Sequence, residues 1–144
     1  MKPNHWIGVA VAEHIHAAVA GGFIQLGHGK QAPLKRLSPG DQIVLYATKQ
    51  SLDDGTAVNS FVAVGEIDDE EIRQVSQTDC FHPFRRGVTY DVSVNPVSIR
   101  PMLSELDLTK ERGRHWGMAL RQSLVKISEN DFRTIIDRMK ARTN

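Results

Sequence analysis

Cysteine is almost absent from this sequence, and apolar runs long enough to cross a membrane are missing altogether. Cys80 is the only cysteine among 144 residues, so no disulfide can form within the chain, and we expect a reducing, cytoplasmic compartment. No apolar run reaches the about 18 residues of a membrane-spanning helix, so we expect no membrane partner. The first residues, MKPNHWIGVAVAEHIH, carry histidines and a glutamate where a secretory signal needs an apolar core and a cleavage site.

Sequence motifs of catalysis are also missing. The chain contains no Walker A loop, dinucleotide-binding fingerprint or nucleophile elbow. His14 and His16 stand two apart, which places them on different faces of a helix rather than together on a metal. Cys80 and His82 lack a group that would orient a thiolate and its base. The acidic run 68–71 lacks the ligand spacing of a calcium loop. We therefore expect no catalytic residue, metal or cofactor.

The length and the charge distribution limit the organisation and the partners. A chain of 144 residues favours one domain, 1–144, with a core large enough to fold without staples. The formal net charge is only +1, but residues 51–71 hold seven acidic side chains and no lysine or arginine. Basic residues gather before and after this segment. A positive face formed by those flanks would attract phosphates, and an ordinary solvated surface explains the same pattern.

The apolar pattern predicts short strands and short helices without a regular βαβ rhythm. We expect strands at 5–12, 42–48, 60–67, 88–97 and 124–127, and helices at 13–20, 100–107, 115–123 and after Ser128. The last helix is the clearest, because Ser128 and Asp131 form a capping box before one apolar stripe. Gly21 and Gly22 end the first helix. The prediction is an α+β fold, a small curved sheet or barrel decorated with short helices.

The remaining signal lies in one basic segment and in the aromatic residues. GFIQLGHGKQAPLKRLSPGD, residues 22–41, is too long for a hairpin loop and too ordered in composition for a linker. Phe81, Tyr90 and Phe132 are expected in the core. Trp6 and Trp116 stand near histidine and glycine, so each tryptophan fits either the core or a pocket wall on which a planar base stacks.

The order of these features resembles the EVE-domain family of the PUA-like superfamily, which includes the YTH proteins that bind methylated adenine. The resemblance covers nearly the whole chain. It rests on HWIGVA, GGFIQLGHGKQAPLKRLSPGDQIVLYA, FVAVGEI, FHPFRRGVTYDV, VSIRPMLSEL and HWGMALRQSLVKISENDFRTI. It implies a PUA-like small twisted β-barrel with a pocket at one mouth that holds a flipped, often modified base.

The resemblance also implies which residues form the site. The implied pocket residues are Trp6, Phe23, Gln25, His28, Gly29, Lys30, Tyr46, Trp116, Arg121 and Ser123, and the implied phosphate contacts are Lys35, Arg36, Arg85 and Arg86. The resulting hypothesis is a non-enzymatic module that binds RNA or DNA through a base in an aromatic-lined pocket.

Two other functions stay open on the sequence. One is a hydrolase or glycosylase acting on nucleotides, with His28 as general base and Asp41 or Asp91 as orienting carboxylate. The other is a sensor of a free nucleotide or another small molecule. The choice between DNA and RNA, the base that is bound and the oligomeric state also stay open.

Overall fold

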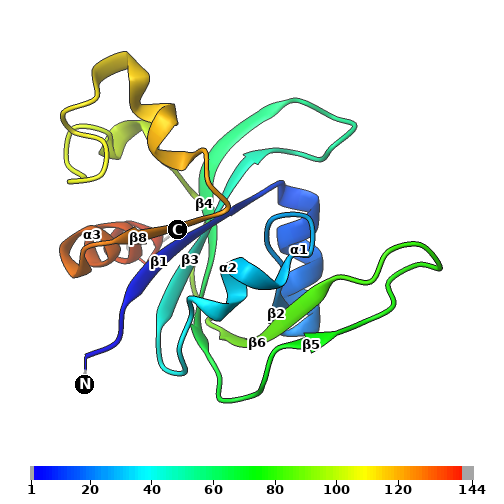
Figure 1. Cartoon of the computed structure of the whole chain (residues 1–144). Helices are drawn as coiled ribbons and strands as arrows, with labels where there is room; N and C mark the ends of the chain where they lie inside the picture. The colour runs from blue at the N-terminus through cyan, green and yellow to red at the C-terminus, as the bar shows by residue number, and fades with distance from the viewer. Residues whose placement is uncertain (1, 141–144) are drawn as a thin grey trace.

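The computed structural model of the chain describes residues 2–140, and its centre is one curled, mixed β-sheet (Figure 1). The path of hydrogen-bonded strands is β2-β6-β4-β3-β1-β8, with β5 paired to β6 and β7 paired to β4. β1 and β3 are parallel, and the other pairs are antiparallel. The strands are β1 (His5–Ala10), β2 (Phe23–Ile24), β3 (Gln42–Lys49), β4 (Ala57–Ile67), β5 (Arg73–Gln74), β6 (Phe84–Tyr90), β7 (Val97–Ser98) and β8 (Leu124–Ile127).

The helices are short and lie on both sides of the sheet. α1 (Ala12–Gly21) and α2 (Gln31–Lys35) lie on one side, and α3 (Glu129–Lys140) lies on the other (Figure 1). Two 3-10 segments, η1 (Arg100–Met102) and η2 (Gly113–Leu120), belong to an excursion between β7 and β8. The architecture confirms the expected α+β fold, a curled half-barrel with short helices.

The sheet curls because its central strands are irregular and cross closely. The register between β3 and β4 shifts at Leu45/Tyr46 and again at Ala47/Lys49, and such bulges increase local bending. β4 pairs with β7 at its beginning and with β6 at its end. A Cβ on Gly65 would lie 2.6 Å from Val88 Cγ1 and 2.8 Å from the Thr89 carbonyl oxygen. Glycine is therefore required where β6 crosses β4.

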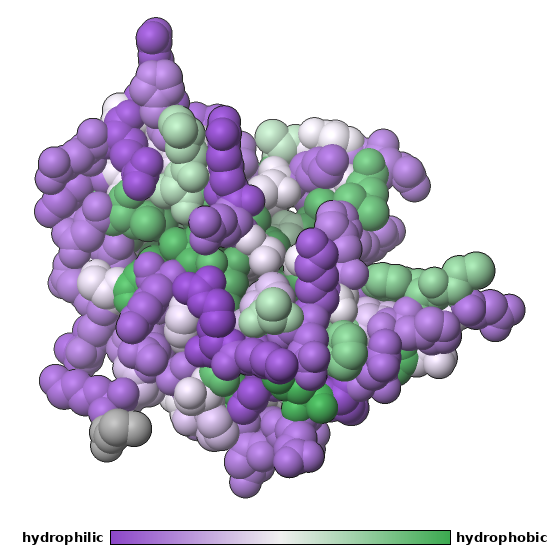
Figure 2. Space-filling view, in the orientation of Figure 1, coloured by the Kyte–Doolittle hydropathy of each residue, from purple (hydrophilic) through white to green (hydrophobic). Residues whose placement is uncertain are grey.

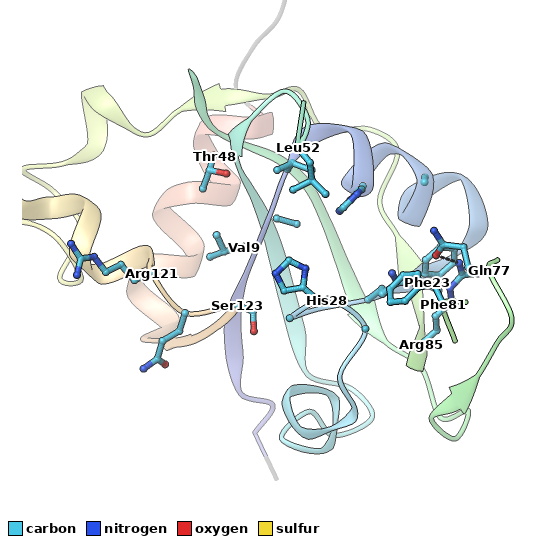
Figure 3. Close-up of a pocket in the computed structure, with 18 residues that line it drawn as sticks. Val9, Phe23, His28, Thr48, Leu52, Gln77, Phe81, Arg85, Arg121 and Ser123 are labelled. Carbon is cyan, nitrogen blue, oxygen red and sulfur yellow. Dashed lines mark hydrogen bonds between the residues drawn. The ribbon is translucent and has the colours of Figure 1, made fainter. Parts of the chain in front are cut away.

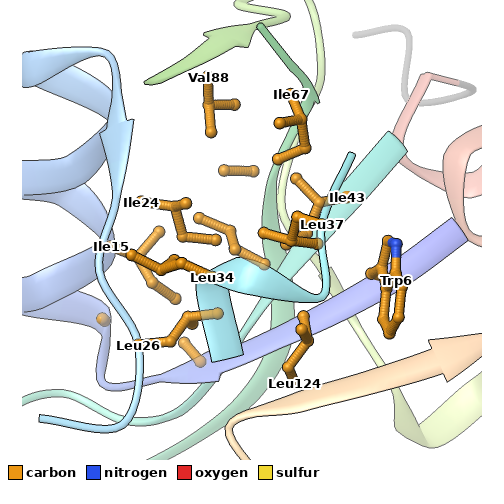
Figure 4. Packing of buried hydrophobic residues seen from close by; sticks show 14 residues of the cluster. Trp6, Ile15, Ile24, Leu26, Leu34, Leu37, Ile43, Ile67, Val88 and Leu124 are labelled. Carbon is orange, nitrogen blue, oxygen red and sulfur yellow. The ribbon is translucent and has the colours of Figure 1, made fainter. Parts of the chain in front are cut away.

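Two apolar clusters fill the two sides of the sheet, because successive strand residues point to opposite faces. Trp6, Ile15 and Leu34 belong to the cluster inside the curl, with Trp6 and Ile15 on opposite sides of it (Figure 4). Ile7, the next residue, packs with the second cluster, which includes buried residues of α3. Figure 2 shows a largely hydrophilic face broken by small hydrophobic patches. Within the described residues, no helix has both the length and the apolarity to cross a membrane.

The expected elements are confirmed where local signals are strong. The expected strands at 42–48, 60–67 and 124–127 correspond to β3, β4 and β8. Gly22 ends α1 in the left-handed region, with φ of 70°. Ser128 Oγ accepts the Asp131 backbone N–H at 3.0 Å, as a cap should. The Asp131 carboxylate instead accepts the backbone N–H groups of Asp107 and Leu108, which ties α3 to the excursion.

The strand expected at 88–97 is wrong beyond Tyr90. The Asp91 carboxylate accepts both the backbone N–H and the hydroxyl of Ser93, which closes a turn of the type that aspartate favours. Val92 is consequently 89% exposed. The helices expected at 100–107 and 115–123 are only the 3-10 segments η1 and η2, in which local turns such as the hydrogen bond from the Met102 N–H to the Ile99 carbonyl replace a longer α-helix.

Candidate functional site

A cavity of about 590 Å³ opens at the end of the half-barrel where β1 finishes (Figure 3). Its walls come from five parts of the chain: the end of β1 with α1, the segment after β2, the β3–β4 connection, the β5–β6 hairpin with β6, and the segment before β8. The lining residues are Val9, Ala10, Val11, His14, Ala17, Phe23, Gln25, Gly27, His28, Gly29, Thr48, Leu52, Gln77, Phe81, Arg85, Arg121, Gln122 and Ser123. The volume falls within the range of small-ligand sites, about 300–1,000 Å³.

One end of the cavity is organised around Arg85. Its guanidinium carbon lies 4.0 Å from the ring centroid of Phe23. Its Nε donates to Gln25 Oε1 at 3.0 Å, and its Nη2 donates to Gln77 Oε1 at 3.1 Å. Partial burial, together with nearby Arg73, lowers the pKa of Arg85, and a guanidinium still stays charged in proteins. Stacking and two hydrogen bonds therefore hold a cation at a defined position in the wall.

A tight loop forms the floor between the two ends. Gly27, His28 and Gly29 have φ values of 55°, 62° and 82°, three left-handed residues in succession. A Cβ on Gly29 would lie 2.4 Å from Pro83 Cβ, and the Gly29 carbonyl accepts the Phe84 N–H at 2.9 Å. The loop is thus pressed against the start of β6. His28 adopts a conformation that costs a non-glycine residue about 1–2 kcal/mol, and its exposed side chain lies in the cavity (Figure 3).

The opposite end is formed by the segment that enters β8. The Val9 N–H donates to the Ser123 carbonyl at 2.9 Å, which attaches this segment to β1. Arg121 is exposed at the rim, and Figure 3 shows Arg121 and Arg85 at opposite ends of the cavity with His28 between them. An extended ligand could therefore contact a cation at each end.

The lining is basic and contains no carboxylate. Arg85, Arg121, His14 and His28 are lining residues, and no aspartate or glutamate is among them. Within residues 2–140, no three histidine, cysteine, aspartate or glutamate side chains are grouped so that they could hold a metal ion. The cavity can donate hydrogen bonds and attract negative charge.

Of the ten residues that were expected to form the pocket, six are found in the lining of this cavity. One of the four expected phosphate contacts is found there too. The six are Phe23, Gln25, His28, Gly29, Arg121 and Ser123, and the seventh is Arg85. Whether they bind a ligand stays a prediction.

The placement of Trp6 in the pocket wall is wrong. Trp6 is 4% exposed, and its Nε1–H donates to Asp41 Oδ2 at 3.0 Å. The guanidinium carbon of Arg36 lies 5.0 Å from the centroid of its ring. Trp6 begins β1, whereas the cavity is at the end of that strand, about 13 Å away at the usual rise per residue. The indole belongs to the core at the other end of the half-barrel.

Tyr46, Trp116 and Lys30 do not line the cavity either. Tyr46 is 1% exposed, packs edge-on against Phe61 and lies in the second cluster; burial raises its pKa to about 12. Trp116 packs partly buried against the same cluster, with Arg100 over its ring. Lys30 is exposed at the start of α2. The expectation that a tryptophan shares a concave site with the 25–30 loop is therefore wrong.

Of the four expected phosphate contacts, only Arg85 lines the cavity. Lys35 and Arg36 are exposed at the end of α2. Arg86 is only 8% exposed, and its buried Nε has no hydrogen-bond partner among residues 2–140. Arg85 and Arg86 are neighbours on β6 and so point to opposite faces. The surface role predicted for Arg86 is wrong.

The residues proposed for the enzymatic alternative are not brought together. Asp41 is buried and accepts hydrogen bonds from Asn4, Trp6 and Ser38. Asp91 caps its own turn. Neither lines the cavity that His28 enters.

Sequence reasoning missed the apolar and neutral polar part of the lining. His14 was expected to lie on a different helix face from His16, and Phe81 was expected in the core; both line the cavity, as do Thr48, Leu52 and Gln77. Phe81 stands in one of the segments that carry the family resemblance, which was the available signal. Nothing local marks Gln77, because its role arises from a hydrogen bond to Arg85.

Comparison with known proteins by sequence gives the family that the sequence features resemble. A family profile described as "EVE domain" matches residues 4–138. A UPF0310 protein of Renibacterium salmoninarum is 41% identical over 132 residues, which cover 92% of each chain.

Solved structures with little sequence identity share the fold. The YTH domain of the Zygosaccharomyces rouxii MRB1 protein, in complex with N6-methyladenosine RNA, superposes with a TM-score of 0.59 at 14% identity, over 99% of this chain and 87% of that one. The N-terminal domain of Staphylothermus marinus McrB gives a TM-score of 0.58 at 12% identity, over 96% of both chains. The half-barrel is therefore the PUA-like fold that these domains share.

Proposed function

Because this chain belongs to the EVE-domain family, we propose that it is a non-enzymatic nucleic-acid-binding module that holds one unstacked base, modified or unmodified, in the cavity. The single observation that carries the proposal is the composition of the wall: aromatic side chains, fixed hydrogen-bond donors and two arginines, without a carboxylate. Proteins that bind an extruded base use aromatic or apolar contacts for its faces and hydrogen bonds for its edge.

The aromatic part of the wall is Phe23 and Phe81, in place of the tryptophans expected from the sequence. Arg85 already covers Phe23 at 4.0 Å. Phe81 is half-buried and touches the cavity, so it is the ring on which we expect a base to stack. Base stacking on aromatic side chains contributes about 1–3 kcal/mol per base.

Exposed basic residues beside the cavity supply the expected backbone contacts. Arg121 lies at the rim, and Lys30 directly follows the floor loop. Lys35 is exposed at the end of α2, whereas Arg36 lies over Trp6 and so away from the mouth. Such contacts position a nucleic acid without selecting its sequence. The exposed Cys80 fits a reducing compartment, and the cytoplasm remains our prediction for its location.

The test is a fluorescence-anisotropy titration of the full chain with single-stranded RNA and DNA, run beside free nucleosides. Arg121→Glu should weaken oligonucleotide binding. The matched control is Arg133→Glu on α3, an exposed arginine that pairs with Glu129 away from the cavity, and it should leave binding unchanged. Absence of oligonucleotide binding, or equal effects of the two variants, would contradict the proposal. Binding of free nucleosides alone would indicate a sensor, and turnover of the oligonucleotide would indicate an enzyme.

A further inference from the structure

Arg85 determines how two glutamine side chains face the cavity. Its N–H groups can only donate, so the oxygens of Gln25 and Gln77 must be the atoms that face it, at 3.0 and 3.1 Å. The orientation of both amides is thereby settled by chemistry. Each amide keeps its NH₂ group, which is purely a donor, for other partners.

The guanidinium itself keeps further donors. A guanidinium carries five N–H groups, and two of them are used by the glutamine oxygens. The Phe23 ring beneath it, 4.0 Å from the guanidinium carbon, restrains the plane of the fork. Because Arg85, Gln25 and Gln77 all line the cavity, a ligand at this end meets a cluster of donors.

No side chain of this lining is purely an acceptor. The lining contains no aspartate or glutamate, and its hydroxyls, its imidazoles and the Gln122 amide can both donate and accept. A ligand that supplies acceptors can pair with the donors of Arg85, Gln25 and Gln77, whereas a ligand that brings more donors meets them with like polarity, so the first is favoured.

We infer that the cavity selects a base that presents two adjacent hydrogen-bond acceptors, of the guanine type, over adenine and N6-methyladenine. This inference rests on the proposed function. Guanine offers O6 and N7 side by side, the pair that an arginine fork contacts most often. Adenine offers N7 beside an N6 amino donor, which would face the Arg85 cluster with the wrong polarity. A methyl group on N6 leaves that donor in place and adds bulk.

The experiment uses the full chain and single-stranded oligonucleotides of abasic spacers with one central base. The central position is guanine, 7-deazaguanine, adenine, N6-methyladenine or abasic. 7-Deazaguanine keeps the shape of guanine and removes one acceptor, N7. We expect guanine to bind roughly fivefold to a hundredfold more tightly than each of the others. Free guanosine monophosphate, added as a competitor, distinguishes binding of the nucleotide from binding of the polymer.

Two variants connect that preference to the donor cluster. Arg85→Lys keeps the charge and removes the fork, and Gln77→Glu replaces an exposed donor amide with a carboxylate. Both should reduce the guanine preference to within about twofold, whereas Arg133→Lys should preserve it. Circular dichroism of each variant shows whether it is folded.

The possible outcomes test the inferred guanine preference separately from the proposed nucleic-acid binding. A guanine preference that disappears in both variants supports the inference. Tighter binding of adenine or N6-methyladenine, or equal binding of all bases, overturns the inference and leaves nucleic-acid binding intact. A guanine preference that survives Arg85→Lys shows that another group selects the base, which also overturns it. Failure of every oligonucleotide to bind overturns the proposed function as well.

Discussion

The two ends of strand β1 use polar groups in opposite ways. At its beginning, the Asp41 carboxylate accepts three hydrogen bonds, from the backbone N–H groups of Asn4 and Ser38 and from the Trp6 indole. This closed end is buried and internally satisfied. The other end of β1, which we call the open end, lies at the cavity. There Arg85, Gln25 and Gln77 direct hydrogen-bond donors into a lining that contains no carboxylate. The polar groups at the closed end pair with one another, whereas the donors at the open end are available to a ligand.

The two ends are therefore expected to differ in what their polar groups contribute: stability of the fold at the closed end and ligand binding at the open end. A fully satisfied buried network specifies one arrangement of the core. The Arg85 cluster instead presents donors to a cavity, where a ligand that supplies acceptors can use them. Side-chain substitutions in the Asp41 network should therefore change the free energy of unfolding, and side-chain substitutions in the cavity wall should change the affinity for nucleic acid.

The largest effect is expected for Trp6→Ala. Removing a buried indole leaves a cavity and removes one of the three hydrogen bonds that Asp41 accepts, so we expect a loss of about 3–5 kcal/mol in the free energy of unfolding. Urea unfolding followed by circular dichroism measures it. The folded fraction should keep its affinity for an oligonucleotide.

The control for this substitution is at the open end. Leu52 is apolar, 58% exposed and lines the cavity, so Leu52→Ala should change the free energy of unfolding by less than about 0.5 kcal/mol. A loss below 1 kcal/mol for Trp6→Ala would show that the closed end is not the rigid part of the molecule.

Two glycines with similar backbone conformations allow a second comparison of the two ends of the half-barrel. Gly29 and Gly40 have φ values of 82° and 88°, so alanine costs about 1–2 kcal/mol at either position. A Cβ on Gly40 meets nothing within 4 Å, whereas one on Gly29 collides with Pro83.

Gly29→Ala should therefore lower the free energy of unfolding more than Gly40→Ala does. Only Gly29→Ala should also weaken oligonucleotide binding, because only its loop forms the floor of the cavity. Thermal unfolding and anisotropy titration of both variants measure these effects. Equal stability losses would mean that the loop moves away from Pro83 without strain.

The third prediction concerns the aromatic wall at the open end. Phe81→Ala should reduce affinity for an oligonucleotide by about 1–3 kcal/mol, roughly fivefold to a hundredfold, through lost stacking. Phe81→Leu keeps apolar area but lacks a ring face, so this variant should bind the oligonucleotide nearly as weakly as Phe81→Ala does. An affinity restored by leucine would assign Phe81 to packing rather than to stacking.

The smallest effect is expected in the salt dependence of binding. If Arg121 contacts a phosphate, Arg121→Gln should reduce the slope of log K against log salt by about 1. Arg86→Gln should leave the slope unchanged, because that side chain is buried. Titrations at several salt concentrations measure both slopes. A reduced slope for Arg86→Gln would place this residue on the binding surface after all.

The sequence by itself determined the elements whose signals are local. The capped, striped segment after Ser128 becomes α3, Gly22 ends α1, and the apolar run at 42–48 becomes β3. The family resemblance also indicated six residues that line one cavity, Phe23, Gln25, His28, Gly29, Arg121 and Ser123. Capping, left-handed glycines and apolar periodicity depend on a few neighbouring residues, so they are visible in the chain alone.

Only the tertiary structure decided which side chains face the cavity and which are enclosed. Alternation along β6 shows that Arg85 and Arg86 point apart, but only the packing of the sheet shows that Arg86 is the buried one. Trp6 joins the closed end because Asp41, distant in sequence, accepts its N–H. Arg85 meets Gln25 across 60 residues of chain. A hydrogen bond between distant residues depends on how strands pair and how the sheet curls, and no local pattern carries that information.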